Sequence, residues 1–165
     1  MDGQVLEKLY ELYRREIYLY LYSLCRDPDT AEDLTQESFL RALLALPKGH
    51  ENMRAWLYRV ARNLFFDLRR RKPELSLEES GELPAGEDEA LERLVRDEQR
   101  RLLLRLIGTL ERKKREVLVL QYYSGLGQKE IAALLGLSHE NVRVLSLRAR
   151  RELRKKLEEN GYDFS

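Results

Sequence analysis

Residues 127–153 read GQKEIAALLGLSHENVRVLSLRARREL, and this stretch predicts two helices that meet at a tight turn. The first helix spans Gln128 to Leu135, and Gly136 follows it, because glycine tolerates the positive φ at which many helices end. Ser138 is a strong N-cap for the second helix. The apolar residues spaced to pack between the two helices are Ile131, Leu135, Leu137, Val142 and Leu145. This pattern is typical of a helix-turn-helix.

The second of these helices carries several arginines on the side away from that apolar core. Its outward positions are His139, Glu140, Arg143, Val144, Leu147, Arg148, Arg150 and Arg151. In a major groove, Arg143 and Arg148 can pair with guanine edges or phosphates, while Val144 and Leu147 can contact thymine methyl groups. A short helix, a glycine turn and a basic helix also occur in bundles that bind no nucleic acid, so that alternative stays open.

The composition of the 165 residues favours an all-α chain of one medium domain or two small ones. Leu, Glu, Arg and Ala dominate and β-branched residues are scarce, which favours helix over strand. Hydrophobic residues make up 43%, enough for a packed core, and 9 Gly and 4 Pro are too few for a broadly disordered chain. A large catalytic barrel does not fit this length.

Few residues are available for metal, redox or covalent chemistry. Cys25 is the single cysteine, which excludes an internal disulfide framework, and two histidines supply a zinc site poorly. The sequence contains no GxxxxGK[ST], GxGxxG, HExxH or GxSxG motif. We therefore predict a protein without metal or cofactor that is not an enzyme. Because no run reaches ~18 apolar residues and no secretion leader is visible, we expect a cytoplasmic protein.

The net charge of +1 hides an alternation of acidic and basic segments. Residues 1–46 contain 5 basic residues (Lys and Arg) and 9 acidic residues (Asp and Glu), a net charge of −4. Residues 47–73 contain 8 basic and 2 acidic residues, a net charge of +6. The basic and acidic residues number 5 and 11 in 74–111, a net charge of −6, and 12 and 4 in 112–157, a net charge of +8. Residues 158–165 contain no basic and 3 acidic residues, a net charge of −3. Two basic blocks separated by an acidic one predict two separate surfaces for a polyanion.

The stretch 73–89, PELSLEESGELPAGEDE, combines acidic residues with proline and glycine and lacks sustained periodicity. We predict a flexible acidic linker there, between two small helical domains. In the second domain, helices are expected from about Glu89 to Leu110 and from Glu116 to Tyr123, before the helix-turn-helix.

The first half of the chain predicts three helices. The stripe of the first helix is formed by Leu6, Leu9, Tyr10, Tyr13, Ile17, Tyr20, Leu21 and Leu24. A second helix follows Asp27-Pro28 and runs to about Leu46, and Thr30 with Asp33 resembles a capping box. The third spans about Asn52 to Arg71, and its apolar face holds Met53, Trp56, Leu57, Val60, Ala61, Leu64 and Leu68.

The opposite face of the third helix mixes aromatic and basic residues. They are Tyr58, Arg59, Arg62, Asn63, Phe66, Arg69 and Arg70. We expect this face to be solvated, where arginines can contact phosphates and an exposed ring can stack on an unpaired base. The alternative is that Tyr58 and Phe66 cover a neighbouring helix while the arginines are merely solvated, and periodicity does not separate the two.

Three segments together resemble bacterial RNA polymerase sigma factors of the extracytoplasmic-function group of the sigma-70 family. They are AEDLTQESFLRAL (31–43), RAWLYRVARNLFFDLRRRK (54–72) and the helix-turn-helix, in the family's order. The resemblance implies a sigma domain 2 at 1–72, the linker at 73–89 and a sigma domain 4 at 90–165. It implies a subunit that binds core RNA polymerase and directs promoter-specific initiation.

The resemblance also assigns three groups of site residues. Those matched to the core-polymerase surface are Asp33, Gln36, Glu37, Phe39 and Leu43. Those matched to recognition and melting of the minus-ten element are His50, Asn52, Trp56, Tyr58, Arg59, Arg62, Asn63, Phe66 and Arg69. Those matched to the minus-thirty-five element are Lys129, His139, Glu140, Asn141, Arg143, Val144, Leu147, Arg148 and Arg150. For Trp56, core packing is favoured over base contact because it lies on the apolar face.

The implied partners are core RNA polymerase, promoter DNA as duplex and melted strand, and an anti-sigma factor, with the chain itself not embedded in a membrane. The linker resembles the segment that threads toward the polymerase active-site cleft, where its charge could occupy a basic channel until RNA displaces it. A plain spacer is the alternative for the linker. The alternative function is a stand-alone helix-turn-helix regulator, which would bind duplex DNA without polymerase.

Overall fold

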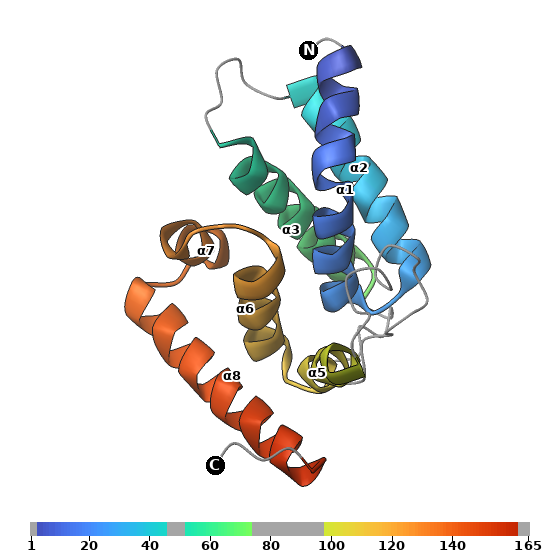
Figure 1. Ribbon diagram of the computed structural model, residues 1–165. Helices are drawn as coiled ribbons and strands as arrows, with labels where there is room; N and C mark the ends of the chain where they lie inside the picture. The colour runs from blue at the N-terminus through green and yellow to red at the C-terminus, as the bar shows by residue number, and fades with distance from the viewer. Residues whose placement is uncertain (1–2, 46–51, 74–97, 162–165) are drawn as a thin grey trace.

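The computed structural model describes residues 3–45, 52–73 and 98–161, whose helices form two packed groups (Figure 1). The first group consists of α1 (Gly3–Cys25), α2 (Pro28–Ala45) and α3 (Met53–Arg71). The second consists of α5 (Glu98–Gly108), α6 (Arg112–Tyr123), α7 (Gln128–Leu135) and α8 (His139–Glu159). No strand occurs in the described ranges. The predicted all-α fold with two small helical domains is confirmed.

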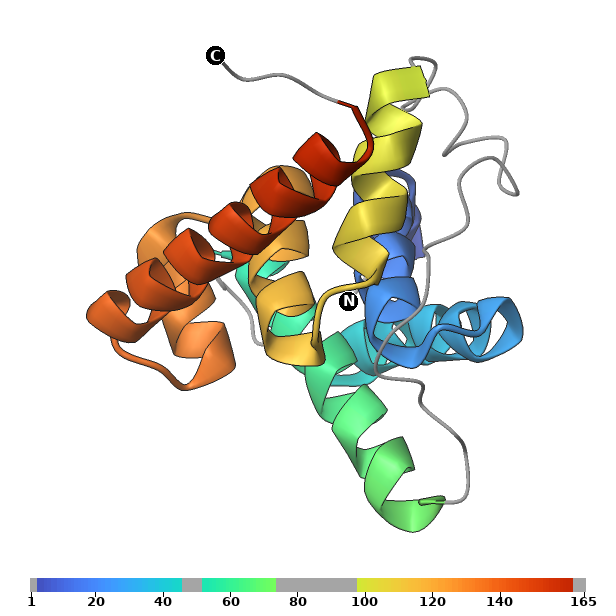
Figure 2. The same ribbon diagram turned by 90° about the horizontal axis from the view of Figure 1, so that it is seen from below.

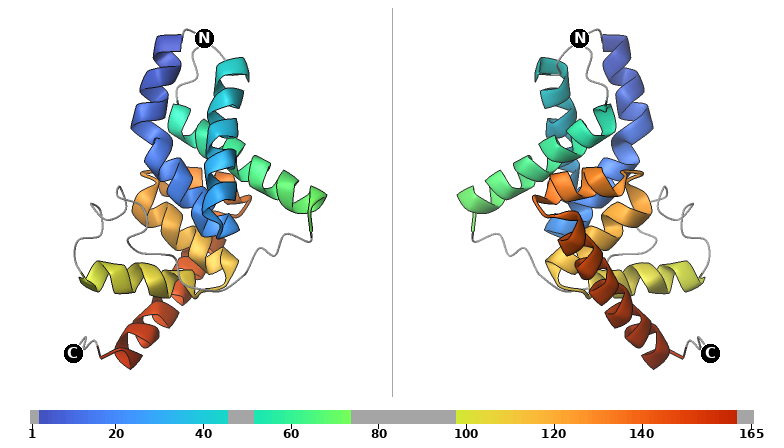
Figure 3. Two further views of the ribbon diagram at one scale, coloured as in Figure 1. Left: turned by 90° about the vertical axis from the view of Figure 1, so that its right-hand side faces the viewer. Right: turned by 90° about the vertical axis from the view of Figure 1, so that its left-hand side faces the viewer.

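Helices α1 and α2 form an antiparallel pair, and α3 lies across both (Figure 3). Asp27 caps α2, because its Oδ2 accepts hydrogen bonds from the Thr30 amide at 3.0 Å and from the Thr30 hydroxyl at 2.6 Å. The predicted capping box of Thr30 with Asp33 is therefore wrong. Asp27 directly precedes Pro28, the first helical residue, so it occupies the cap position itself.

Helix α3 starts and ends close to its predicted bounds. The Asn52 side chain caps it, because its Oδ1 accepts a hydrogen bond from the Ala55 amide at 3.0 Å. The residues of α3 that are buried are Leu57, Tyr58, Ala61, Leu64 and Phe65. They pack on α1 and α2, so the outer side of the helix is the only one left for a partner or for the second helical group.

Helix α6 belongs to the second group and packs against α1 of the first group (Figures 1 and 2). All residues from Arg115 to Leu120 are buried. A helix with one covered face buries only every third or fourth residue, so an uninterrupted buried run requires cover on both sides. Helices α7 and α8 cover α6 on one side and α1 covers it on the other. The two helical groups therefore share one continuous apolar core.

Two helix starts differ from the sequence-based expectation or lie outside the description. Helix α6 begins at Arg112 rather than at Glu116. Periodicity did not reveal this first turn, because residues 112–115 form no apolar stripe, but Lys and Arg are good helix formers. Residues 89–97 of the predicted preceding helix lie outside the described residues, as do residues 74–89 of the predicted linker.

The helix-turn-helix has the predicted boundaries. Gly136 adopts φ of 67°, and the Leu137 amide donates to the Ala132 carbonyl at 3.0 Å, which is the Schellman arrangement for ending a helix. The Ser138 Oγ accepts a hydrogen bond from the Asn141 amide at 3.1 Å and caps α8. The helix end at Gly136 and the N-cap at Ser138 together set the angle between α7 and α8.

The part of the chain that the structure describes contains neither a membrane-spanning helix nor a metal-binding cluster. No helix within 3–45, 52–73 and 98–161 is both long and apolar enough to cross a membrane. Over the same residues, no cluster of three or more His, Cys, Asp or Glu side chains is arranged to hold a metal ion.

Candidate nucleic-acid interface

Helix α8 has one buried stripe and a broad exposed surface. Its buried residues are Val142, Ser146, Ala149 and Leu153. The predicted groove-facing residues that are exposed are Lys129, His139, Glu140, Asn141, Arg143, Leu147, Arg148 and Arg150. Val144 is half-buried. The structure thus places basic, polar and apolar groups together where a major groove could receive them.

Arg143 and Glu140 form an ion pair in solvent on the first turns of α8. The Arg143 Nη2 lies 2.7 Å from the Glu140 Oε1, and the two side chains are 74% and 65% exposed. The hydrogen bond from Arg143 holds the pKa of Glu140 below its ordinary value. Because water screens the pair, a phosphate or a base edge can take its place at little cost.

Unlike α8, helix α3 exposes only some of the basic and polar residues predicted to contact DNA. Arg59 and Asn63 are exposed, and Arg70 is exposed while it contacts Asp67. Arg69 is half-buried. His50 of the predicted minus-ten group lies outside the described residues. Among the described residues of the predicted group, the exposed ones are therefore Arg59, Asn63 and the N-cap residue Asn52.

Two aromatic residues of α3 are not on a solvated face, which corrects the expectation. Tyr58 is 1% exposed, and its ring lies 5.1 Å from that of Tyr20. Burial, together with the nearby Glu16 carboxylate, raises the pKa of the Tyr58 hydroxyl. The expectation assumed one covered side, but α1 and α2 together bury a wider arc of α3. Trp56 is half-buried against the core, as favoured from its position on the apolar face.

Phe66 is the second aromatic correction. It is half-buried, and two guanidinium groups lie over its ring, that of Arg62 at 4.6 Å and that of Arg112 of α6 at 5.1 Å. A cation over a ring face is attracted to its negative quadrupole. In this arrangement Phe66 contacts a neighbouring helix, which is the alternative reading, and its stacking surface is taken by arginines.

Arg62 is held by a buried carboxylate of the second helical group. Its Nε lies 2.8 Å from the Glu116 Oε2 and its Nη2 lies 3.4 Å from the Oε1. The Tyr20 hydroxyl donates to the same Oε2 at 2.6 Å. Burial alone would lower the pKa of Arg62, but the hydrogen bond and charge of Glu116 raise it. Burial and then Glu116 also raise the pKa of Tyr20 well above its ordinary value, so both groups stay protonated donors.

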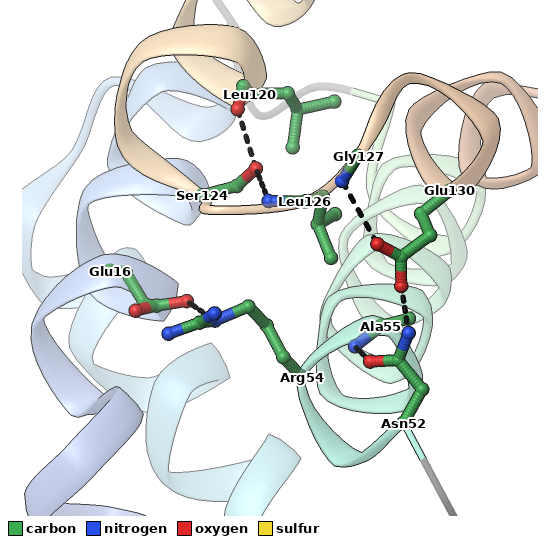
Figure 4. A network of polar contacts seen from close by, with 9 residues as sticks. All are labelled: Glu16, Asn52, Arg54, Ala55, Leu120, Ser124, Leu126, Gly127 and Glu130. Carbon is green, nitrogen blue, oxygen red and sulfur yellow. Dashed lines mark hydrogen bonds and ion pairs between the residues drawn. The ribbon is translucent and has the colours of Figure 1, made fainter.

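A second set of contacts joins the start of α3 to α7 (Figure 4). The Asn52 Nδ2 donates to the Glu130 Oε2, and the Glu130 Oε1 accepts from the Gly127 amide at 2.9 Å. Arg54 donates to Glu16 at 2.9 Å. A Cβ built on Gly125, whose φ is 71°, would lie 2.9 Å from the Arg54 Nη1. Glycine is therefore favoured at this position by its backbone conformation, and a larger residue would also have to displace the end of the Arg54 side chain.

Arg115 and Arg26 each donate a hydrogen bond to a backbone carbonyl of the other helical group. The Arg115 Nε donates to the Ser23 carbonyl of α1 at 2.7 Å, and its Nη1 donates to the Leu110 carbonyl at 2.9 Å. The Arg26 Nη1 donates to the Gly108 carbonyl at 2.8 Å. Sequence reasoning missed these residues and Glu116, because their partners are distant in the chain and no local pattern marks them.

Helix α2 displays the predicted acidic surface, with one correction. Asp33 and Gln36 are exposed, and Glu37 is half-buried and paired with Arg41 at 3.2 Å. Phe39 is only 4% exposed and packs edge-on against Tyr10, so it supports this surface from within. Leu43 is half-buried.

The exposed large apolar side chains of α2 are Leu40 and Leu44, at 52% and 82% exposure. They follow the predicted Phe39 and Leu43 by one residue each. One residue turns a helix by about 100°, so a single step along α2 leads from buried Phe39 and half-buried Leu43 to exposed Leu40 and Leu44. Counting Leu34, Ser38 and Ala42 as buried would have indicated the correct side.

Comparison with known families matches both helical groups. The model of sigma-70 region 2 matches residues 9–73, and that of sigma-70 region 4 matches residues 100–153. These two matches cover most of α1–α3 and most of α5–α8 respectively.

Individual proteins match over almost the whole length. The extracytoplasmic-function RNA polymerase sigma factor SigM of Bacillus subtilis is 31% identical over 153 residues, covering 90% of this chain and 93% of its own. SigW of the same organism is 30% identical over 171 residues, covering 94% and 90%. The sigma factor RpoE of Bartonella quintana, solved with the anti-sigma factor NepR, shares the fold with a TM-score of 0.72 and 23% identity, covering 92% of this chain and 96% of its own.

Proposed function

The chain belongs to the extracytoplasmic-function sigma factors of the sigma-70 family, and from this premise we propose how its surfaces divide the work of promoter recognition. As a member, it is an RNA polymerase sigma factor that directs promoter-specific transcription initiation. The comparisons do not favour the stand-alone regulator. Sigma factors are non-enzymatic initiation factors, and we propose that this chain has no catalytic activity of its own and acts in the cytoplasm.

The division into parts follows the two helical groups. Residues 1–72 form the part that binds core polymerase and the minus-ten element, and residues 90–165 form the part that reads the minus-thirty-five element. Residues 73–89 join them as a linker that runs toward the polymerase cleft. The segment charges of +6 over 47–73 and +8 over 112–157 support one polyanion surface in each part.

The α8 surface reads the minus-thirty-five element in the major groove. The observation that carries this proposal is that α8 buries one narrow stripe and exposes its predicted groove-facing side chains, apart from half-buried Val144. Arg143 and Arg148 supply base or phosphate contacts, and Leu147, which is 49% exposed, supplies an apolar contact. The others of this group are Lys129, His139, Glu140, Asn141, Val144 and Arg150.

The α3 surface binds and opens the minus-ten element. Arg59 and Asn63 contact the DNA from their exposed positions. Asn52, Arg62 and Phe66 join them once their present partners release them. Tyr58 and Trp56 act as positioning residues from the interior, and His50 and Arg69 flank the site. Flipping a base costs a few kcal/mol, which hydrogen bonds and stacking in a pocket offset.

The α2 surface docks on core polymerase. Asp33, Gln36 and Glu37 supply polar contacts at its exposed side. Leu40 and Leu44 replace Phe39 as the apolar contacts, because they are exposed whereas Phe39 is packed in the core. Leu43 lies at the edge of this surface. Exposed leucines beside charged groups are typical of a protein–protein interface.

An anti-sigma factor is the proposed regulatory partner. The similar RpoE of Bartonella quintana has been solved in complex with the anti-sigma factor NepR. By this likeness we propose that a protein of the same kind sequesters the present chain.

Reconstitution with core RNA polymerase tests the function directly. The purified chain is mixed with bacterial core polymerase, and the complex transcribes a genomic DNA pool with and without the chain. We expect stable association and new, discrete start sites. Replacement of Leu44 by Asp should weaken the association, while replacement of the exposed Leu12 of α1 by Asp serves as the matched control. Binding to duplex DNA without any association with core polymerase would restore the stand-alone regulator.

A further inference from the structure

A cavity of about 150 Å³ lies where side chains of α3, α6, α7 and α8 meet. Its deep end is formed on α6 by Glu116 and Val117, which are 2% and 0% exposed. Lys113 lies one turn earlier on the same helix and is exposed, so the cavity opens to solvent on that side. A purely apolar cavity of this volume can hold benzene, so the space suits a ligand of the size of one ring.

Part of the lining is apolar and incompletely covered. It consists of Val117 together with Leu135, Leu137 and Leu145, and these three leucines are half-buried. Atoms that face a cavity lack the dispersion contacts of a packed interior. An apolar group in the cavity would supply those contacts and would remove leucine surface from water. This part of the lining therefore favours a ligand with an apolar body.

The rest of the lining is charged, with three cations and one carboxylate. They are Arg62, Arg112, Lys113 and Glu116. The carboxylate of Glu116 is already occupied, because it accepts hydrogen bonds from Arg62 at 2.8 Å and from Tyr20 at 2.6 Å. Within residues 3–45, 52–73 and 98–161, neither Arg112 nor Lys113 forms an ion pair with a carboxylate. Two positive charges at the cavity are therefore not compensated there.

Two of the three cations share one aromatic ring. The guanidinium carbon of Arg62 lies 4.6 Å from the centroid of the Phe66 ring, and that of Arg112 lies 5.1 Å from it. The two guanidinium groups are therefore within about one Debye length of each other, ~10 Å at 0.1 M salt, where like charges still repel. An anionic group in the cavity would offset this repulsion.

The size of the cavity separates this ligand from nucleic acid. A single nucleotide joins a base, a sugar and a phosphate and is much larger than one benzene ring, so a DNA strand does not fit. An inorganic anion would fit but would leave the apolar lining uncovered. An apolar lining next to uncompensated cations instead matches a small molecule that has both an apolar body and a negative charge.

We propose that this cavity binds a small amphiphilic carboxylate, which is an aromatic or short aliphatic monocarboxylate with an apolar body of about one ring. Its carboxylate lies beside Arg112 and Lys113, and its apolar body covers Val117, Leu137 and Leu145. The ligand binds the free chain, and its binding does not depend on the proposed contacts with DNA or with core polymerase.

Titration of the isotope-labelled full chain with sodium benzoate at constant ionic strength tests the site by NMR. We expect saturable shifts of the amide signals around Val117, Leu137 and Leu145, with a dissociation constant on the order of 1 mM for so small a ligand. Benzamide has the ring without the charge, and acetate has the charge without the ring. Each should bind at least about fivefold more weakly than benzoate.

Two variants distinguish the cavity from the basic surface around it. Lys113→Met removes a cation from an exposed position and should weaken benzoate binding about fivefold, whereas Leu145→Phe fills the space and should abolish binding. The matched controls Lys155→Met and Leu12→Phe make the same changes at exposed positions outside the cavity and should leave the affinity unchanged. Circular dichroism verifies that each variant is folded. Should Leu145→Phe not fold, Lys113→Met and its control decide.

Several outcomes overturn the proposal. Shifts that do not saturate, or that are confined to the exposed arginines of α8, mean a general attraction of anions to a basic surface. Equal binding of benzoate and acetate means that the apolar lining takes no part. Equal binding of benzoate and benzamide means that the cations take no part. An unchanged affinity for benzoate in Lys113→Met and in Leu145→Phe places the binding outside this cavity.

Discussion

Helices α3 and α8 both carry arginines at helical spacing, yet the fold treats their guanidinium groups in opposite ways. On α8, Arg143 is 74% exposed and its partner Glu140 is 65% exposed. On α3, Arg62 is 22% exposed and its partner Glu116 is 2% exposed. Both pairs join an arginine to a glutamate at similar distances, but the α3 pair is buried, links two helices and shares its carboxylate with the Tyr20 hydroxyl.

This difference determines how each surface can meet DNA. Water screens the α8 pair, so DNA can replace Glu140 without leaving a buried charge behind. Removing Arg62 from Glu116 instead leaves a carboxylate in the interior, and breaking a buried pair in this way costs several kcal/mol. We therefore expect the proposed α8 surface to bind DNA without rearrangement, whereas Arg62 of the proposed α3 surface can contact DNA only after Glu116 releases it.

The largest expected effect concerns the junction between the groups. Arg115→Met keeps the length of the side chain but removes the donors to the Ser23 and Leu110 carbonyls, and Arg115 is 1% exposed. We expect a loss of about 2–4 kcal/mol in the free energy of unfolding, because buried acceptors are left unpaired. Urea denaturation measures it.

The matched control for this variant lies on the exposed surface. Arg148→Met on α8 should change the free energy of unfolding by less than about 0.5 kcal/mol. Equal losses in the two variants would mean that the junction contributes no more to stability than the α8 surface does, which would break the comparison.

The next effect concerns DNA binding by α8. Replacing Arg143 or Arg148 by Ala should weaken binding of holoenzyme to the minus-thirty-five element by about 1–3 kcal/mol if either makes a two-point base contact. Footprinting at fixed salt measures the affinity. Arg154→Ala is the control, because Arg154 lies further along α8 and pairs with Glu158. An unaltered footprint in both variants would remove these arginines from the site.

The next prediction compares Gly125, which lies at the junction between the helical groups, with Gly136 in the turn of the helix-turn-helix. Gly125 and Gly136 have φ of 71° and 67°, so alanine strains either by about 1–2 kcal/mol. Gly125→Ala should cost more, because its Cβ would lie 2.9 Å from the Arg54 Nη1 and would displace Arg54 from Glu16, whereas nothing lies within 4 Å at Gly136. Thermal unfolding compares them. A larger loss in Gly136→Ala would contradict the contact.

The smallest effect is a difference in titration between two glutamates. Burial raises the pKa of Glu16 above its reference of 4.5, although Arg54 opposes this, whereas the hydrogen bond from Arg143 lowers the pKa of Glu140. As the pH falls, Glu16 should protonate above pH 4.5 and stabilise the folded chain. Glu140 should protonate below pH 4.5, and the stabilisation by its ion pair is then lost. NMR of side-chain carboxyl carbons measures both, and the reverse order would contradict the assigned environments.

Much of the molecule followed from local patterns in the sequence. Apolar residues at helical spacing predicted the helices, and Gly136 with Ser138 predicted the turn of the helix-turn-helix with its observed bounds. The same kind of signal misjudged Tyr58, because periodicity reveals one apolar face and does not reveal how wide an arc the neighbours bury. Phe39 was placed at the surface by the family resemblance, and it is buried. The family could be identified because its three motifs are contiguous segments.

The sequence by itself determined the all-α class, the two parts and the sigma-factor family, since each rests on propensity, periodicity or contiguous motifs. Only the tertiary structure decided which arginines are available. Glu116 lies 54 residues from Arg62 and 96 from Tyr20, and no local pattern encodes that meeting. The environment of a charge depends on which distant helices surround it, and burial changes the strength of a carboxylate–guanidinium pair more than the residue types do.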